Sequence, residues 1–261
     1  MTTAGTSGDV SIDNNTTALG IQGTINGGLT VVNGAAITDS GTLTVSGTSS
    51  FTIDTGSNHI TLGTAALTGA IGVATSGTSN FTLDNTTTAV NLGTVGVTGA
   101  LSVTSGAAIT DSGVITVGGT ATFVTDVNDI DIVLDSNNAI TGAVTFTTQT
   151  GGSNGADITF DNGTTAISLA GFTTRGNLTL QTDAAIALTG HTVNGALAVT
   201  SADAITQSAA LTVSGTSSFT STGSNDKITL TQANALTGAV TLTTAGTSGD
   251  VTIDNGTTPL G

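Results

Sequence analysis

The 261-residue sequence contains no cysteine, tryptophan, tyrosine or glutamate, and it has one proline and one methionine. The missing glutamate and the scarce lysine, arginine and methionine remove most of the residues that favour helices, so a helical fold is disfavoured. The absence of cysteine fits a large secreted protein whose repeated core needs no disulfide bonds.

Positive charge is almost absent as well. Arg175 and Lys227 are the only fixed cations, and the formal net charge is −15. A protein with so few cations cannot neutralise phosphates or dock on anionic lipid, so we expect no nucleic-acid partner. No stretch approaches the roughly 18 apolar residues of a membrane helix, so no membrane insertion is expected. The first ten residues, MTTAGTSGDV, lack the basic and apolar regions of a signal peptide.

The residues that dominate are glycine, threonine, serine, alanine and asparagine, together with valine, isoleucine and leucine. Threonine, valine, isoleucine and phenylalanine favour strands, whereas glycine, asparagine, aspartate and serine favour turns. Leucine, isoleucine, valine and phenylalanine make up about a quarter of the chain, above the share below which disorder is expected. The composition therefore predicts an ordered all-β protein.

Internal repeats organise the chain. AAITDSG begins at Ala35 and again at Ala107, at an offset of 72, and a related DAITQSA begins at Asp203, at a further offset of 96. GTSSFT begins at both Gly47 and Gly215, at an offset of 168. These offsets are all multiples of 24, which indicates units of about 24 residues grouped into larger blocks.

The two ends of the sequence are also alike. AGTSGDVSIDNNTTALG (Ala4–Gly20) returns as AGTSGDVTIDNGTTPLG (Ala245–Gly261) with three substitutions. We expect such a chain to be an excerpt of a longer array. One continuous repeat rod over residues 1–261 is predicted, with blocks at about 8–79, 80–155 and 156–249 and the start of a further block at 250–261.

Within each unit, apolar residues alternate with polar ones over three to five positions and a turn then follows, which is the pattern of short strands. We predict a single-chain parallel β-helix, or β-solenoid, of about 11 coils with roughly 24 residues per coil. Equivalent residues at an offset of 72, such as Phe51 and Phe123, should then stack in one column. An antiparallel sandwich is the alternative, although it gives no reason for residues at these offsets to be the same.

The runs GDVTIDNGTT, GALSVTSGAAITDSG and GNLTLQTDAAIALTG resemble the repeats of filamentous-haemagglutinin and autotransporter-passenger proteins. The resemblance covers nearly the whole chain. It implies a β-helical stalk of a large bacterial surface or secreted protein, hence an extracellular or cell-surface location. The secretion-signal domain of that family is absent from this sequence.

The densest acidic segment is VTDVNDIDIVLD, which contains Asp126, Asp129, Asp131 and Asp135. In a strand, the last three would share one face with Val133, while the alternate isoleucines and leucine would face the core. The simpler interpretation is an outward acidic strand. The alternative is a Ca²⁺ site, because carboxylate oxygens suit hard cations, although the spacing does not match an EF-hand.

Other candidate residues are few. His59 corresponds to Lys227 at an offset of 168, which indicates a solvated position, and His191 corresponds to Val95. Asp-Asn pairs that begin at Asp13 and Asp84, among others, are interpreted as corner residues of turns. No catalytic residues and no cofactor other than possible Ca²⁺ are predicted, and we expect the protein not to be an enzyme.

The sequence therefore predicts a structural segment, a stalk or filament-building solenoid of an adhesin-like protein. Its expected partners are other copies of itself, end to end, and a host or partner-cell surface. A Ca²⁺-dependent adhesive module is the alternative. A threonine-rich ice-binding solenoid is a further one, although the Thr-x-Thr pairs do not recur at one fixed place in every unit.

Overall fold

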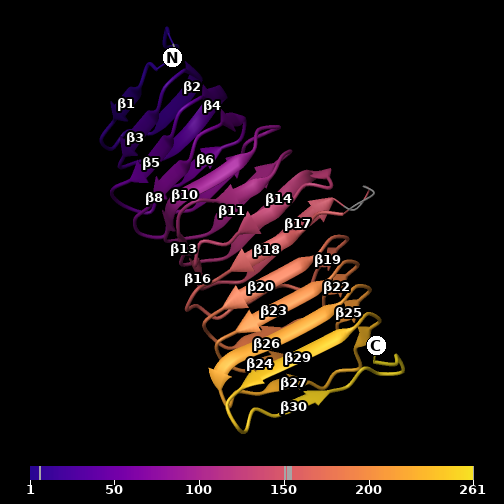
Figure 1. The fold of residues 1–261 in the computed structure, drawn as a ribbon. Helices are drawn as coiled ribbons and strands as arrows, with labels where there is room; N and C mark the ends of the chain where they lie inside the picture. The colour runs from indigo at the N-terminus through magenta and orange to yellow at the C-terminus, as the bar shows by residue number, and fades with distance from the viewer. Residues whose placement is uncertain (6, 150, 152–154, 261) are drawn as a thin grey trace. The chain divides into compact units, whose positions relative to one another are not determined.

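The computed structural model describes residues 1–5, 7–149, 151 and 155–260, which form a parallel β-solenoid of about 12 turns with about 20 residues per turn (Figure 1). These residues form strands, turns and bends and include no helix, so none of them could cross a membrane as a helix. The predicted all-β parallel solenoid is confirmed. Thr6 and Gly261, which belong to the two matching end segments, lie outside the described residues.

The chain divides into two compact units, Met1–Val127 and Asn128–Gly261. Unit 1 contains two parallel sheets. The first consists of β1 (Val10–Asp13), β3 (Leu29–Asn33), β5 (Ser49–Ile53), β8 (Ile71–Ala74), β10 (Val90–Val97), β12 (Ile109–Asp111) and β13 (Ile115–Val117). The second consists of β2 (Leu19–Ile25), β4 (Ile37–Val45), β6 (Ile60–Leu62), β7 (Ala65–Leu67), β9 (Phe81–Asp84), β11 (Leu101–Ser105) and β14 (Ala121–Asn128).

Unit 2 has three sides to each turn. The longest strands form one parallel sheet, β15 (Ile132–Leu134), β18 (Ile158–Asp161), β20 (Leu178–Thr182), β23 (Leu197–Ser201), β26 (Ser217–Ser224) and β29 (Val240–Ala245). The second side is β19 (Thr173–Thr174), β22 (Thr192–Val193), β25 (Thr212–Val213) and β28 (Ala235–Leu236). The third side is β21 (Ile186–Leu188), β24 (Ile205–Gln207), β27 (Ile228–Leu230) and β30 (Val251–Ile253), and the unit also contains β16 (Ala139–Ile140) and β17 (Val144–Gln149).

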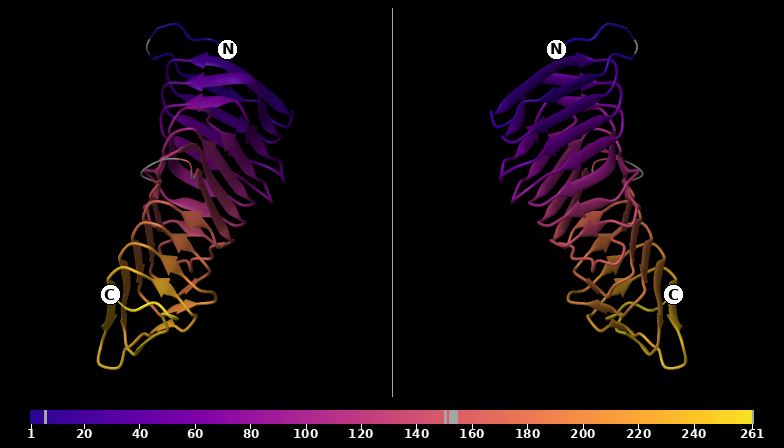
Figure 2. Two further views of the ribbon diagram at one scale, coloured as in Figure 1. Left: turned by 90° about the vertical axis from the view of Figure 1, so that its right-hand side faces the viewer. Right: turned by 90° about the vertical axis from the view of Figure 1, so that its left-hand side faces the viewer.

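The strands form because their apolar residues alternate and can line a narrow core on one side only. In β3 and β5, Leu29, Val31, Phe51 and Ile53 are buried, while Thr30 between them is exposed. Successive turns stack in register, and Figure 2 shows this stacking within each unit from both sides. The core of each turn is therefore completed by the turns above and below it.

The turns are shorter than the repeat unit predicted from the sequence, because a turn contains only about 20 residues. Successive strands of the first sheet pair Val10 with Leu29, Leu29 with Ser49 and Ser49 with Ile71. The copy of β1 in the next repeat is β9, and it begins at Phe81 in the other sheet. The offset of 72 therefore spans three turns and about half of another, so it does not measure whole coils.

The prediction that Phe51 and Phe123 share one column was wrong for the same reason. Phe51 lies in β5 of the first sheet and Phe123 lies in β14 of the second. Their surroundings are nevertheless equivalent, because Phe51 pairs with Val31 and Phe123 pairs with Val103 of the preceding turn. Both rings are fully buried, so repeat identity reflects equivalent packing in alternate sheets.

Several corners of unit 1 bring the backbones of neighbouring turns close together, and Gly47 is an example. A Cβ atom added to Gly47 would lie 2.6 Å from the carbonyl carbon of Gly27 in the preceding turn. Cβ atoms in proteins essentially never lie closer than 3.0 Å to another heavy atom of this kind, so a side chain here would push the two turns apart. Glycine is needed at this corner for close stacking.

Candidate functional site

The acidic segment that the sequence singles out is less regular than predicted. Asp126 lies in β14 and is exposed, whereas Asp129 lies in a turn with a φ of 59°. Asp131 and Asp135 are exposed and flank β15, which contains only the three residues Ile132–Leu134. The expected strand over 129–135 is therefore wrong, because the left-handed turn at Asp129 ends the extended backbone.

The carboxylates of this segment bind backbone groups. Asp129 Oδ1 accepts a hydrogen bond from the N–H of Gly155 at 2.8 Å, and Asp131 Oδ1 accepts one from the N–H of Asp157 at 2.8 Å. Asp157 Oδ1 in turn accepts a hydrogen bond from the N–H of Asn177 at 2.7 Å. Asp131, Asp157 and Asn177 thus join three successive turns at one corner of unit 2.

The sequence does contain a signal for this corner. Asp131, Asp157 and Asn177 each stand immediately before a buried residue that begins a strand. A short acceptor side chain at that position can reach the N–H of the next turn. The density of acidic residues in one segment does not reveal these hydrogen bonds, because the partner of each acceptor lies a whole turn away along the chain.

Across the residues that the structure describes, no group of three or more histidine, cysteine, aspartate or glutamate side chains is arranged to hold a metal ion. The Ca²⁺ site at Asp126, Asp129, Asp131 and Asp135 stays a prediction. Asp131 would have to bind the cation while one of its oxygens accepts the N–H of Asp157.

The two histidines occupy opposite environments. His59 is exposed, as predicted, and its Nδ1 accepts a hydrogen bond from the N–H of Asn80 at 3.0 Å. His191 is buried, with its ring 4.9 Å from the ring of Phe172, and burial lowers its pKa to about 4. Its Nδ1 has no hydrogen-bond partner within the described part of the chain. His191 is therefore a neutral core residue at neutral pH.

Lys227 and Asp250 form an exposed ion pair, with Nζ 2.8 Å from Oδ2. Their hydrogen bond and mutual attraction raise the pKa of Lys227 and lower the pKa of Asp250. Both residues stand directly before a strand, at β27 and β30 of successive turns. The pair therefore joins two turns at a corner. It contains a single carboxylate, so it does not provide the two acidic groups that acid–base catalysis by paired carboxylates requires.

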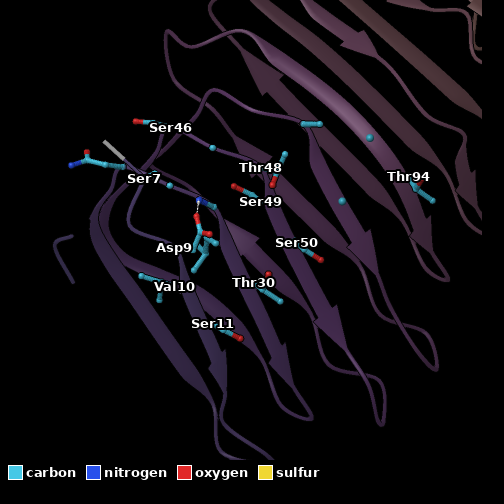
Figure 3. Close-up of a pocket in the computed structure, with 18 residues that line it drawn as sticks. Ser7, Asp9, Val10, Ser11, Thr30, Ser46, Thr48, Ser49, Ser50 and Thr94 are labelled. Carbon is cyan, nitrogen blue, oxygen red and sulfur yellow. Dashed lines mark hydrogen bonds between the residues drawn. The ribbon is translucent and has the colours of Figure 1, made fainter. Parts of the chain in front are cut away.

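A shallow groove of about 870 Å³ lies over the first sheet of unit 1 (Figure 3). Its floor contains a row of small outward residues in register, Ser11, Thr30, Ser50 and Gly72. Asp9 is the only ionisable residue of its lining, and Asp9 Oδ1 accepts the N–H of Gly28 at 2.6 Å. The groove offers hydroxyl groups for hydrogen bonding but holds no acid–base pair.

Comparison with known proteins identifies a family of repeats. The model of a family described as repeats of unknown function (DUF5649) matches residues 7–74, 78–147 and 175–243. No curated protein and no solved structure is significantly similar to the chain. Three matched repeats, which together cover most of the sequence, agree with the stacked strands of the structure. The chain therefore belongs to the family of repeats of unknown function (DUF5649).

Proposed function

We propose that the chain is a structural scaffold, a β-solenoid segment of a secreted or cell-surface adhesin-like protein. The observation that carries this proposal is the register of successive turns, in which buried residues of one turn stack on buried residues of the turn before. The pairs Ser49–Ile71 in unit 1 and Leu178–Leu197 in unit 2 are examples. Stability in such an array accumulates from neighbour to neighbour.

The chemistry of the faces supports a scaffold in preference to an enzyme. The outward residues in the groove are mainly hydroxyl and glycine residues, and its one carboxylate is already bound to a backbone N–H. The buried imidazole of His191 faces the core, where it cannot meet a substrate. The resemblance to filamentous-haemagglutinin and autotransporter-passenger repeats supports the surface or secreted location.

Stretching single molecules tests the proposal directly. A load-bearing solenoid should release its turns one after another. Each turn has about 20 residues of about 3.5 Å each, so each step should lengthen the chain by about 65 Å after one strand spacing is subtracted. Phe51→Ala should lower the force of one step, whereas Thr52→Ala, on the outward side of the same strand, should not. Release of the whole chain in one weak event would reject a scaffold role.

End-to-end association with other copies is part of the same proposal. In the described part of the chain, β1 pairs only with β3 and β30 pairs only with β27, so each has one free edge. β1 reads VSID, and β30 together with the following Asp254 reads VTID. Stacking them in register would place Asp13 beside Asp254, and salt should weaken that repulsion.

Light scattering over a range of concentration and salt measures this association. We expect the average mass to rise with concentration and to rise more steeply at high salt. Val251→Pro should lower it, because the backbone groups of Asp250 and Asp254 face β27, so the N–H of Val251 faces the open edge and proline removes it. Thr229→Ser, on the covered strand β27, is the control. A monomeric mass under all conditions would contradict end-to-end pairing.

Ice binding is a second candidate function, and one observation favours it. Outward hydroxyls that look scattered in the sequence form a continuous column on the second sheet of unit 1: Thr38, Thr61, Thr82, Ser102 and Thr122. Neighbouring strands of a sheet lie about 4.8 Å apart, so the column is a regular row of hydroxyls. Inhibition of ice recrystallisation that is lost in Thr61→Lys would support it, and no inhibition by the wild type would exclude it.

A further inference from the structure

In each turn of unit 1, one sheet receives a short single strand and the other sheet receives a longer segment. The two sheets exchange these contributions between β8 and β9. Up to β8, the short single strands β1, β3 and β5 belong to the first sheet, and the longer segments β2, β4 and β6–β7 belong to the second. From β9 onward the single strands β9, β11 and β14 belong to the second sheet, whereas β10, β12 and β13 belong to the first. The chain therefore places two single strands in succession, on different sheets, at this point.

The same exchange occurs twice in unit 2. β17 is followed by β18, which pairs with β15 and β20 in a sheet that does not contain β17. β29 ends that sheet, and the next strand, β30, pairs with β27 on another side of the turn. Each exchange falls at the sequence where one block ends and the next begins.

An Asp-Asn pair follows each exchange, and its asparagine forms the same pair of hydrogen bonds every time. Asn85 Oδ1 accepts the N–H of Leu67 at 2.8 Å, and Asn85 Nδ2 donates to the carbonyl of Leu67 at 3.0 Å. Asn162 binds the N–H and carbonyl of Ile140 at 2.9 and 3.1 Å. Asn255 binds those of Leu236 at 2.9 and 3.1 Å.

These bonds replace a missing strand. Leu67 ends β7, which pairs with β4 on one side and, in the described residues, with no strand on the other. Leu236 ends β28, which pairs only with β25 in the same part of the chain. A side-chain amide has one acceptor and two donors, so it can satisfy both backbone groups that the next turn would have satisfied. Asn85 and Asn255 are fully or almost fully buried, where an unpaired backbone group would be costly.

The turn around each asparagine is also the same. Oδ1 of the preceding aspartate accepts the N–H two residues on, which belongs to Thr86, Gly163 or Gly256, at 2.7 to 2.8 Å. Those three residues have positive φ angles of 48°, 51° and 58°. The left-handed residue reverses the chain within a few positions and directs the buried amide into the corner.

We infer that the Asp-Asn turn is a switch of sheet: it closes the edge of the last longer segment and starts the next repeat on the opposite side of the solenoid. The first repeat thereby makes three turns and a half, and successive repeats of unit 1 present their single-strand face on alternate sides. This goes beyond a scaffold role. A partner that recognises this face on the first repeat of unit 1 meets the equivalent face of the next repeat on the opposite sheet.

Cysteine cross-linking tests the exchange, and the natural chain contains no cysteine that would interfere. In register across β6 and β9, Thr61→Cys with Thr82→Cys should form a disulfide under mild oxidation. Gly72→Cys with Thr82→Cys should not, because β8 and β9 lie in different sheets. Ser50→Cys with Gly72→Cys, which are partners across β5 and β8, is the positive control. If a disulfide formed efficiently between the cysteines at positions 72 and 82 and none formed between positions 61 and 82, β9 would not lie in the second sheet, and the proposed exchange of sheets would be refuted.

Hydrogen exchange tests the role of the asparagine. In Asn85→Ala, the N–H of Leu67 should exchange at least about tenfold faster, whereas the N–H of Phe51, held by the neighbouring turns, should not change. If Asn85→Ala does not fold, Asn255→Ala at the outermost turn of unit 2 gives the same test on Leu236. Unchanged protection of Leu67 or Leu236 in a folded variant would refute the inference.

Discussion

The buried imidazole of His191 makes the stability of unit 2 depend on pH in a calculable way. Its folded pKa of about 4 lies below the ordinary value of 6.5 because the ring is buried. The unfolded chain therefore binds a proton from about pH 6.5 downward, while the folded chain resists it until about pH 4. The stabilisation is complete above pH 6.5 and is lost as the pH falls toward 4.

The magnitude follows from the difference between the two pKa values. As the pH falls from 7.5 to 5, protonation of the His191 imidazole in the unfolded chain should lower the free energy of unfolding by about 2 kcal/mol. At pH 4 the total loss should be about 3 kcal/mol. The interval from pH 7.5 to pH 5 contains the ordinary histidine pKa of 6.5, so most of the change expected for His191 falls within it. Urea unfolding followed by circular dichroism measures the free energy at each pH.

His191→Leu is the informative variant, because leucine has a similar volume and the chain itself carries an apolar residue, Val95, at the equivalent position. We expect the variant to lose about 2 kcal/mol less than the wild type between pH 7.5 and 5. His59→Gln, which removes the exposed histidine, is the matched control. If His191→Leu and the wild type lose the same stability over this interval, the imidazole is not buried in its neutral form.

Three further changes test other features of the fold. Ser49→Ala should raise the unfolding free energy by about 1 kcal/mol in urea titrations, because the hydroxyl is buried with no hydrogen-bond partner in the described residues; Ser217→Ala should do the same. Gly47→Ala should lower the melting temperature and cost about 1–3 kcal/mol, since the added Cβ meets Gly27, whereas Ala35→Gly at an ordinary turn should cost less. EDTA should lower the melting temperature only if Ca²⁺ binds near Asp131, and Asp131→Asn should then abolish the difference; an identical melting curve with and without EDTA would remove the Ca²⁺ prediction.

The alternation of apolar residues predicted short strands with one buried face, and the internal repeats favoured a solenoid over a sandwich. It could not give the length of a turn. Sequence offsets measure the distance between equivalent residues, and in unit 1 equivalent strands such as β1 and β9 lie in different sheets. The common divisor of 24 was therefore a property of the repeats and not of the coil.

The candidate sites were harder to predict, because their partners are distant in sequence. The Asp-Asn pairs were recognised as corner residues from turn chemistry, and the structure confirms this. That the amide of Asn85 closes the edge at Leu67 depends on a contact 18 residues away that no local pattern contains. Asp129 was assigned to a strand because its neighbours alternate, but its left-handed backbone conformation outweighed that pattern.

The glycine corner at Gly27 and Gly47 also restricts how such a protein can diversify. Because a side chain there would collide with the backbone of the preceding turn, new loops and side chains must be accommodated at other corners. The sequence follows this rule, since TGSNHITL at Thr55 gains one residue in its counterpart TGSNDKITL at Thr222. Foreign peptides grafted at the loop around Asn225 should therefore be tolerated, whereas the same peptides inserted at Gly47 should prevent the turns from stacking.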